Sequence, residues 1–299
     1  MYKKHILLLL TAVFLAAFLT ACGATDDDEN RVVVASKDFT EQFILGEMYA
    51  QLLEDAGYTV TRRLNLGGTP VAHQALLNGE IDLYPEYTGT GLLTVLGLGV
   101  MSDETAVYNT VRDAYAEQFS LVWLDPAPMN NTQALAMTRA RAAELGIATF
   151  SDMVANADQL VLIGPPEFAE REDGLPGLRE VYGDFTFRNF ITVDPGLRYQ
   201  AIQSGEADVV VAFGTDGELA AFDLLSLIDD QGLYPPYQVA PVVRQATLDA
   251  NPELANLLNS LAPLLTDDTM QRLNNEVSGE GREPADVARD FLVSQGLIE

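Results

Sequence analysis

The feature that most constrains the fold is an alternation of apolar runs with amphipathic stretches. In the first half of the chain, RVVVAS (31–36), TVTRRLNL (59–66) and IDLYPEY (81–87) have the composition of strands. Between them lie EQFILGEMYAQLLEDAG (41–57) and PVAHQALLNGE (70–80), which have apolar residues at helical spacing. Such strand–helix–strand alternation predicts a parallel sheet with helices on its faces.

The same alternation restarts in the second half of the chain. Residues 157–166, 185–193 and 207–217 are strand-like, and residues 175–183 and 196–206 have a helical pattern. The chain is long enough for two domains of ordinary size. Two similar α/β units are therefore predicted.

Two extended, proline-bearing segments, 121–137 and 234–245, separate these units and predict two crossings between lobes. We expect lobe 1 to comprise residues 31–125 and 240–299, and lobe 2 to comprise residues 126–239. Ligands of open α/β sheets bind beyond the carboxyl ends of the strands. The prediction is therefore an α/β protein with a ligand cleft between two lobes.

The N-terminus predicts a lipid anchor. Residues 1–21 have a basic start and an apolar run, and LTAC ends in Cys22. The run is shorter than the roughly 20 residues of a spanning helix, so we interpret it as a lipoprotein signal peptide with lipid on Cys22. The alternatives are an ordinary signal peptide or a short buried helix. Residues 22–30 predict an acidic tether, and the protein is expected to be extracytoplasmic and membrane-anchored.

Charge and cysteine content exclude several functions. The chain has 17 Lys and Arg against 44 Asp and Glu, a net charge of −27, which disfavours nucleic acid as a partner. Cys22 is the single cysteine, so its acylation would leave no thiol for a disulfide or for catalysis.

Candidate ligand-binding residues lie where predicted strands end. Thr90 lies in YPEYTGTG (84–91), where glycines are expected to allow a tight turn into a helix whose start suits an anion. Lys37 and Arg171 offer positive charge from the two lobes, the arginine in a fork that matches a carboxylate. The rings of Tyr87, Tyr199 and Phe213 suit a quaternary ammonium group.

Each candidate also has a purely structural alternative. In this alternative the cations are solvated surface charges and the aromatic residues are parts of the core. Residue composition and spacing alone leave this choice open.

The order of longer motifs adds a family resemblance. The chain resembles the substrate-binding lipoproteins of osmoprotectant ABC importers, which bind glycine betaine, carnitine or choline, from about Val32 to the C-terminus. The motifs that carry the resemblance are SKDFTEQFILGEM, NLGGTPVAHQAL, GEIDLYPEYTGTG, PEFAEREDG and AFGTDG, in this order.

The resemblance implies a type II periplasmic-binding-protein fold that closes on a solute and delivers it to a permease, which works with an ATPase subunit. Lys37, Thr90 and Arg171 would hold the carboxylate of a zwitterion. Tyr87 and Tyr199 would be cage rings, and Phe213 falls where the family often has tyrosine. Family members with a complete cage place another ring in the first crossing, where this chain has Ala127 as the expected gap.

Two rival functions remain open at this point. An enzyme is disfavoured because His73 is the one histidine after the signal peptide, and no metal-spaced His/Cys cluster or GxSxG motif occurs. Asp82 and Glu86 are a candidate carboxylate pair for a hydrolase. A binding protein for an amino acid or a polyamine would use the same lobes. No cofactor or metal is expected.

Overall fold

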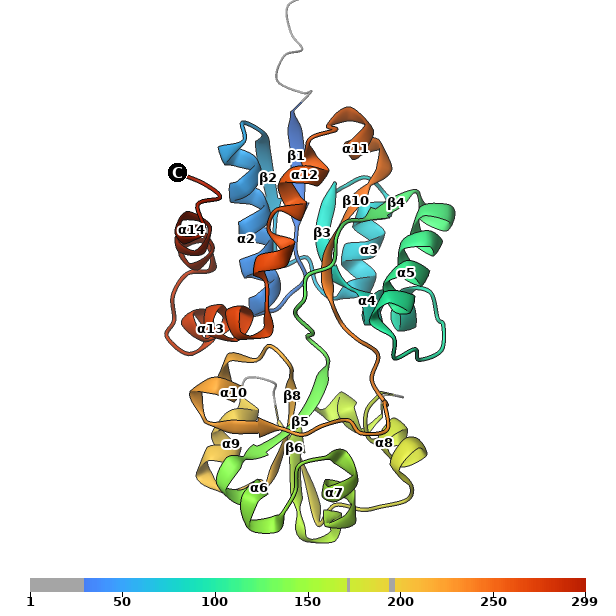
Figure 1. Cartoon of the computed structure of the whole chain (residues 1–299), viewed down its shortest axis with the longest axis vertical. Coiled ribbons are helices and arrows are strands. Elements are labelled where there is room, and N and C mark those ends of the chain that lie inside the picture. Colours follow the sequence, from blue (N-terminus) through green and yellow to red (C-terminus); the bar gives the residue numbers. More distant parts are fainter. Residues whose placement is uncertain (1–29, 171–172, 194–196) are drawn as a thin grey trace, which may run out of the picture.

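The computed structural model describes residues 30–170, 173–193 and 197–299, which form two lobes stacked along the long axis in Figure 1. The predicted signal peptide, Cys22 and most of the predicted tether lie outside the described residues, and so does Arg171.

Lobe 1, the upper lobe in Figure 1, is built on a five-stranded sheet in the order β2-β1-β3-β10-β4. Its strands are β1 (Arg31–Ala35), β2 (Thr59–Arg63), β3 (Leu83–Tyr87), β4 (Leu121–Trp123) and β10 (Val239–Arg244). β1 runs parallel to β2 and β3, as the alternation predicts. β10 is antiparallel to both β3 and β4, so the complete sheet is mixed.

Helices cover both faces of this sheet. They are α2 (Thr40–Asp55), α3 (Thr69–Leu77), α4 (Thr88–Thr90), α5 (Glu104–Phe119), α11 (Gln245–Ala250), α12 (Leu254–Asn259), α13 (Asp267–Ser278) and α14 (Pro284–Ser294). A π-helical turn, Gly91–Val95, continues α4. One face is covered by α3 and α5, and the other by α2 with the C-terminal helices.

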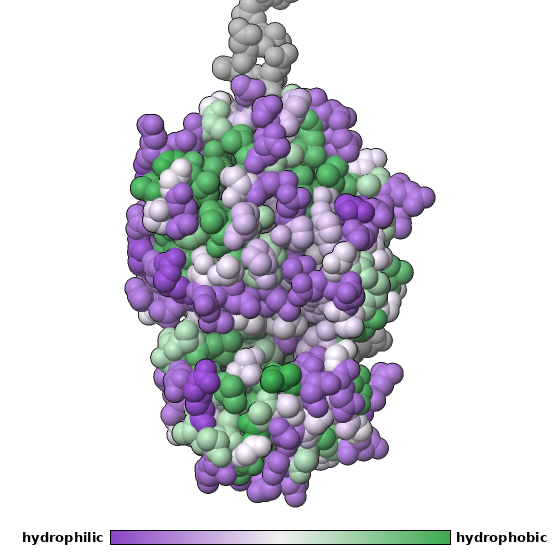
Figure 2. All heavy atoms as spheres, viewed as in Figure 1, coloured by the Kyte–Doolittle hydropathy of each residue, from purple (hydrophilic) through white to green (hydrophobic). Residues whose placement is uncertain are grey.

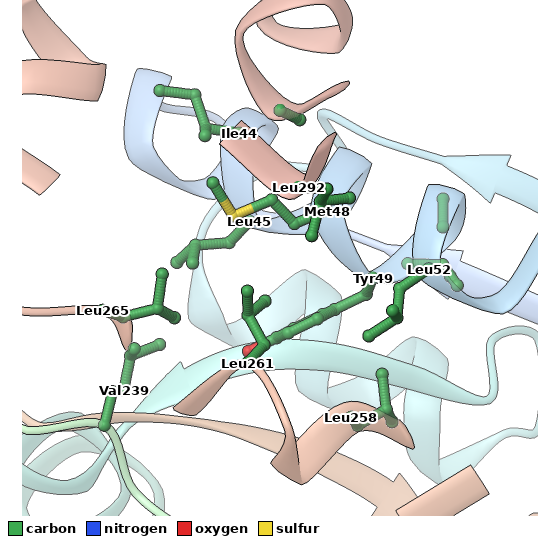
Figure 3. Packing of buried hydrophobic residues seen from close by; sticks show 14 of the residues in the cluster. Ile44, Leu45, Met48, Tyr49, Leu52, Val239, Leu258, Leu261, Leu265 and Leu292 are labelled. Atoms are coloured by element: carbon green, nitrogen blue, oxygen red, sulfur yellow. The ribbon is translucent and has the colours of Figure 1, made fainter. Parts of the chain in front are cut away.

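The core of lobe 1 explains why α2 is apolar on more than one side. α2 lies between the sheet and the C-terminal segment, so residues on several of its faces are buried. Figure 3 shows its side chains packed among leucines of that segment. The labelled α2 residues are Ile44, Leu45, Met48, Tyr49 and Leu52.

Lobe 2 repeats the architecture with a second five-stranded sheet in the order β7-β6-β8-β5-β9. Its strands are β5 (Gln133–Thr138), β6 (Val161–Gly164), β7 (Asn189–Thr192), β8 (Val209–Phe213) and β9 (Leu224–Ser226). Its helices are α6 (Arg139–Leu145), α7 (Phe150–Ala155), α8 (Leu175–Tyr182), α9 (Arg198–Ser204) and α10 (Gly217–Ala221). Here β6, β7 and β8 are parallel, and β5 is antiparallel to its neighbours.

The two crossings between the lobes are joined to each other. Asn130 and Gln238 form an antiparallel bridge. The Tyr237 N–H donates to Asn130 Oδ1 over 2.7 Å, and the Asn131 N–H donates to the Tyr237 carbonyl over 3.1 Å. These bonds hold the two crossings side by side between the lobes. The lobe boundaries at residues 125 and 240 stay a prediction, and β10 itself begins at Val239.

Figure 2 shows hydrophilic residues along the rim of the upper lobe that lies above the lower one, with hydrophobic patches elsewhere on both lobes. In the described part of the chain, every helix is too short or too polar to cross a membrane.

Candidate functional site

The carboxyl ends of the central strands of both sheets face the other lobe. In Figure 1, β1 enters the upper lobe from its far end and runs toward the lower lobe. Lys37 follows β1, Tyr87 ends β3, and Phe213 ends β8. The fold therefore places these three predicted site residues at the junction of the lobes.

A side-chain bridge fixes the backbone around Lys37. The Gln42 amide, at the start of α2, accepts from the Lys37 N–H over 3.0 Å and donates to the Pro85 carbonyl of β3 over 3.0 Å. Buried polar groups are stable only when they are hydrogen-bonded in this way. Gln42 thus ties the end of β1 to β3 and sets the position of Lys37.

The Lys37 side chain is buried and already has partners. Its ammonium lies 2.6 Å from Glu86 Oε1 and 3.3 Å from Thr69 Oγ1. It also lies over two aromatic rings, 4.7 Å from the centroid of Tyr87 and 5.9 Å from that of Phe39. The structure therefore contains an ammonium group seated on aromatic faces at the lobe junction.

The Tyr87 ring is nearly enclosed, with 3% of its surface exposed, and its hydroxyl donates to Glu41 Oε1 over 2.7 Å. The neighbouring ring of Phe39 stacks on it with a centroid separation of 6.2 Å. Phe39 remains 39% exposed, so it is the more accessible ring of this pair.

Glu41 connects the two lobes. Its carboxyl group accepts hydrogen bonds from Asn131 in the first crossing over 2.9 Å and from Asn274 of α13 over 2.9 Å. It also bonds Thr215, which follows β8 in lobe 2. Burial raises the pKa of the Glu41 carboxyl, against the opposing effect of the bonds from Thr215, Tyr87 and Asn274.

The glycines of YPEYTGTG allow close packing instead of a tight turn. Gly89 and Gly91 are in helical segments with negative φ. A Cβ on Gly89 would lie 2.9 Å from carbons of the Tyr237 ring, and one on Gly91 would lie 2.9 Å from the Trp123 ring. The expectation of a glycine turn is therefore wrong. Thr90 lies at the end of α4 and is half-buried beside them.

In lobe 2, Tyr199 and Phe213 lie around a second internal cation. The Arg198 guanidinium is 4.7 Å from the Tyr199 centroid and 5.7 Å from that of Phe213. Asp216 accepts from Arg198 over 2.7 Å and also from the Tyr199 hydroxyl. Tyr199 is 5% exposed and belongs to the lobe 2 core, whereas Phe213 is half-buried.

Ala127 is not at the surface of the cleft. It is 1% exposed and belongs to the hydrophobic core of lobe 1, and its N–H donates to the Val239 carbonyl over 2.8 Å. A ring at this position would have to fit within that core, and the proposed gap in the cage stays a prediction.

The residues that sequence reasoning missed are partners of those it chose. Glu41 and Phe39 lie in SKDFTEQ beside Lys37, and Asp216 lies in FGTDG beside Phe213. Their proximity to chosen residues in these motifs was the available signal. Glu86 was considered as half of a carboxylate pair with Asp82, but Asp82 bonds Thr247 instead.

A cavity of about 600 Å³ opens between the lobes on one side. It is lined in lobe 1 by residues of the π-helical turn and of the segment 97–100 that follows it, and in lobe 2 by Asp173 and Leu233. Within residues 30–170, 173–193 and 197–299, the acidic and histidine side chains form no group that could hold a metal ion.

Residues 30–294 match the family described as the substrate-binding domain of ABC-type glycine betaine transport systems. The chain belongs to this family. Its function class is therefore solute binding for an ABC-type importer, as the sequence resemblance predicts.

Curated relatives agree with this assignment. The glycine-betaine-binding protein of Pseudomonas aeruginosa is 37% identical over 293 residues, which are 95% of this chain and 93% of that protein. The ergothioneine transport permease/ergothioneine binding protein of Helicobacter pylori is 35% identical over 271 residues. That match covers 90% of this chain but 48% of the relative, so this chain spans about half the length of the Helicobacter pylori protein.

A solved structure described as a glycine betaine/carnitine/choline ABC transporter is similar throughout. Its TM-score is 0.83 at 30% identity, and the match covers 90% of this chain and all of that one. The two-lobed architecture is the type II periplasmic-binding-protein fold, as predicted.

Proposed function

We propose that the protein captures a small solute with a quaternary ammonium group, such as glycine betaine, between its lobes and delivers it to a membrane permease. The observation that carries this proposal is the ammonium of Lys37 on the rings of Tyr87 and Phe39 at the lobe junction. An aromatic position that accepts one ammonium has the chemistry to accept another. The family match supports the same solute class.

Within this proposal, Lys37, Thr90 and Arg171 lie on the carboxylate side of the ligand. Phe39, Tyr87 and Phe213 supply aromatic faces. Tyr199 remains a proposed cage residue, although its burial favours support of the site through Asp216. Closure about the two crossings would complete the site.

We also propose that lipid on Cys22 anchors the mature protein outside the cytoplasmic membrane. The LTAC order after a basic, apolar segment supports this attachment. Anchoring would keep the protein next to the permease and its ATPase subunit.

The test is calorimetric titration with a panel of solutes. It comprises glycine betaine, proline betaine, carnitine, choline, ergothioneine and ectoine, together with common amino acids and putrescine as ligands without a quaternary ammonium group. We expect binding by trimethylammonium solutes, together with a Tm that rises with ligand concentration. Binding confined to an amino acid or putrescine would replace this proposal with a different solute, and turnover of an ester or glycoside would indicate a hydrolase.

A further inference from the structure

The ion pair between Lys37 and Glu86 bears on how the site distinguishes its ligands. The lysine side chain is 5% exposed and the glutamate side chain is 0% exposed, and their charged atoms are 2.6 Å apart. At this distance, in a site closed off from water, the field of one charge largely cancels that of the other beyond the pair. A ligand that approaches Lys37 therefore meets a charge that is already compensated.

Glu86 is held so that it cannot move away when a ligand enters. Its Oε1 also accepts from the Tyr87 N–H over 2.8 Å, and its Oε2 accepts from the Tyr84 hydroxyl over 2.9 Å. Glu86 lies in β3, with β10 paired beside it. Both carboxylate oxygens are thus held by groups of the sheet itself, which favours a glutamate that stays beside Lys37 when a ligand enters.

Among the described residues, the charged groups near Tyr87 and Phe213 include carboxylates as well as cations. The second carboxyl group near the Tyr87 ring is that of Glu41, which bonds the Tyr87 hydroxyl. In lobe 2, Arg198 is compensated in the same way by Asp216. Each of these described cations has its own carboxylate partner.

We propose that Glu86 is a specificity-determining residue of the ligand site. By cancelling the charge of Lys37, it makes the lobe 1 wall tolerant of a ligand cation and weakly attractive to a ligand carboxylate. This inference rests on the proposed function, because it concerns how the same site ranks quaternary ammonium ligands with and without a carboxylate.

The central experiment measures Glu86→Gln by titration with three trimethyl ligands of similar shape. Choline is a cation, glycine betaine is a zwitterion, and 3,3-dimethylbutanoate is an anion in which carbon replaces the nitrogen. Glutamine keeps the shape of the side chain but leaves Lys37 uncompensated. The uncompensated ammonium of Lys37 would then repel a ligand cation and attract a ligand anion. We therefore expect choline affinity to fall by roughly tenfold or more, and affinity for the anion to rise by a similar factor, because one unit charge acts from a few ångström away. Glycine betaine should change least.

Glu47→Gln is the matched control. Glu47 is a carboxylate of the same lobe that is paired with Arg62 over 3.0 Å and also accepts a hydrogen bond from Gln51. It removes the same charge from the protein and should leave the ranking of the three ligands unchanged.

Two further variants keep the inference testable if Glu86→Gln does not fold, since an unpaired buried lysine is costly. Lys37→Gln with Glu86→Gln removes both charges, so its ratio of choline to 3,3-dimethylbutanoate affinity should lie between the ratios of the two single variants. Lys37→Gln alone leaves the carboxylate and should shift the ranking toward choline.

An unchanged ratio of choline to 3,3-dimethylbutanoate affinity in folded Glu86→Gln would overturn the inference. So would an equal loss for all three ligands, which would indicate a structural role alone. If the wild-type protein binds neither choline nor glycine betaine, the proposed function itself fails, and this result is separate from either outcome.

Discussion

A methyl group added at Gly217 should separate the lobes on the side away from the crossings. Gly217 begins α10 of lobe 2 and faces α13 of lobe 1, which lies directly above it in Figure 1. A Cβ at this position would lie 2.5 Å from the Asn275 nitrogen and 2.7 Å from its Cα. Because both are backbone atoms, a change of rotamer cannot relieve the contact.

The size of the effect follows from this geometry. Ordinary contact needs a separation of at least 3.4 Å, so the two helices must move apart by close to 1 Å. That movement strains the bonds that α13 makes to lobe 2, from Gln271 to the Gly214 carbonyl over 2.8 Å and from Asn274 to the Thr215 carbonyl over 2.8 Å. Overpacking of this kind costs about 1–3 kcal/mol, which corresponds to an affinity loss of roughly 5- to 150-fold if it opposes closure.

The assay compares Gly217→Ala with the wild type by calorimetric titration and by small-angle scattering without and with ligand. Gly99→Ala is the control, because a Cβ there meets nothing within 4 Å. We expect weaker binding and a larger radius of gyration for Gly217→Ala alone. Wild-type affinity together with unchanged scattering would show that the contact between α10 and α13 does not hold the lobes together, and the argument would fail.

Four further predictions concern other parts of the chain. Arg171→Ala should lower glycine betaine affinity tenfold or more through loss of a charge-assisted bond of roughly 1.5–3 kcal/mol. Titration should show that the affinity for choline changes little. Equal losses of affinity for both ligands would indicate a structural arginine. Cys22→Ala should move the protein from the membrane to the soluble fraction of cells, and retention after a high-salt wash would contradict a lipid anchor. Ala127→Tyr should overpack the lobe 1 core and lower the free energy of unfolding by about 1–3 kcal/mol in urea titrations; tighter ligand binding instead would restore the cage interpretation. Burial lowers the pKa of His73. The unfolded chain therefore takes up a proton below a pH of about 6.5 that the folded chain does not. The free energy of unfolding should fall as the pH drops below that value, and it should fall less in His73→Phe.

Local sequence patterns predict the elements of this fold but not how distant elements meet. Periodicity identifies α2 and the parallel strands because a helix or strand is defined by neighbouring residues. The reversal of β10 depends on its pairing with β3, far away in the chain, and no local signal records it. The glycines of YPEYTGTG are a similar case, because the aromatic ring that requires Gly89 belongs to Tyr237 in the second crossing.

Sequence patterns also do not show which charges of the candidate site are paired. A sequence displays cations and rings, and Lys37, Tyr87 and Phe213 do lie at the junction of the lobes. It does not display whether a cation is compensated or whether a ring face is already covered. Glu86 lies beside Lys37, and Arg198 covers part of Phe213.

These internal contacts change how ligand selection should work. If the site held bare cations, a ligand carboxylate would dominate affinity, because an uncompensated charge in a closed cleft interacts strongly. Because Lys37 is paired with Glu86, we expect aromatic contact with the ligand cation to contribute more to the binding free energy than the ligand carboxylate does. Phe39 is an exposed ring that is available for this contact. The order of affinities among trimethyl ligands is therefore a more direct measure of this site than affinity for any single solute.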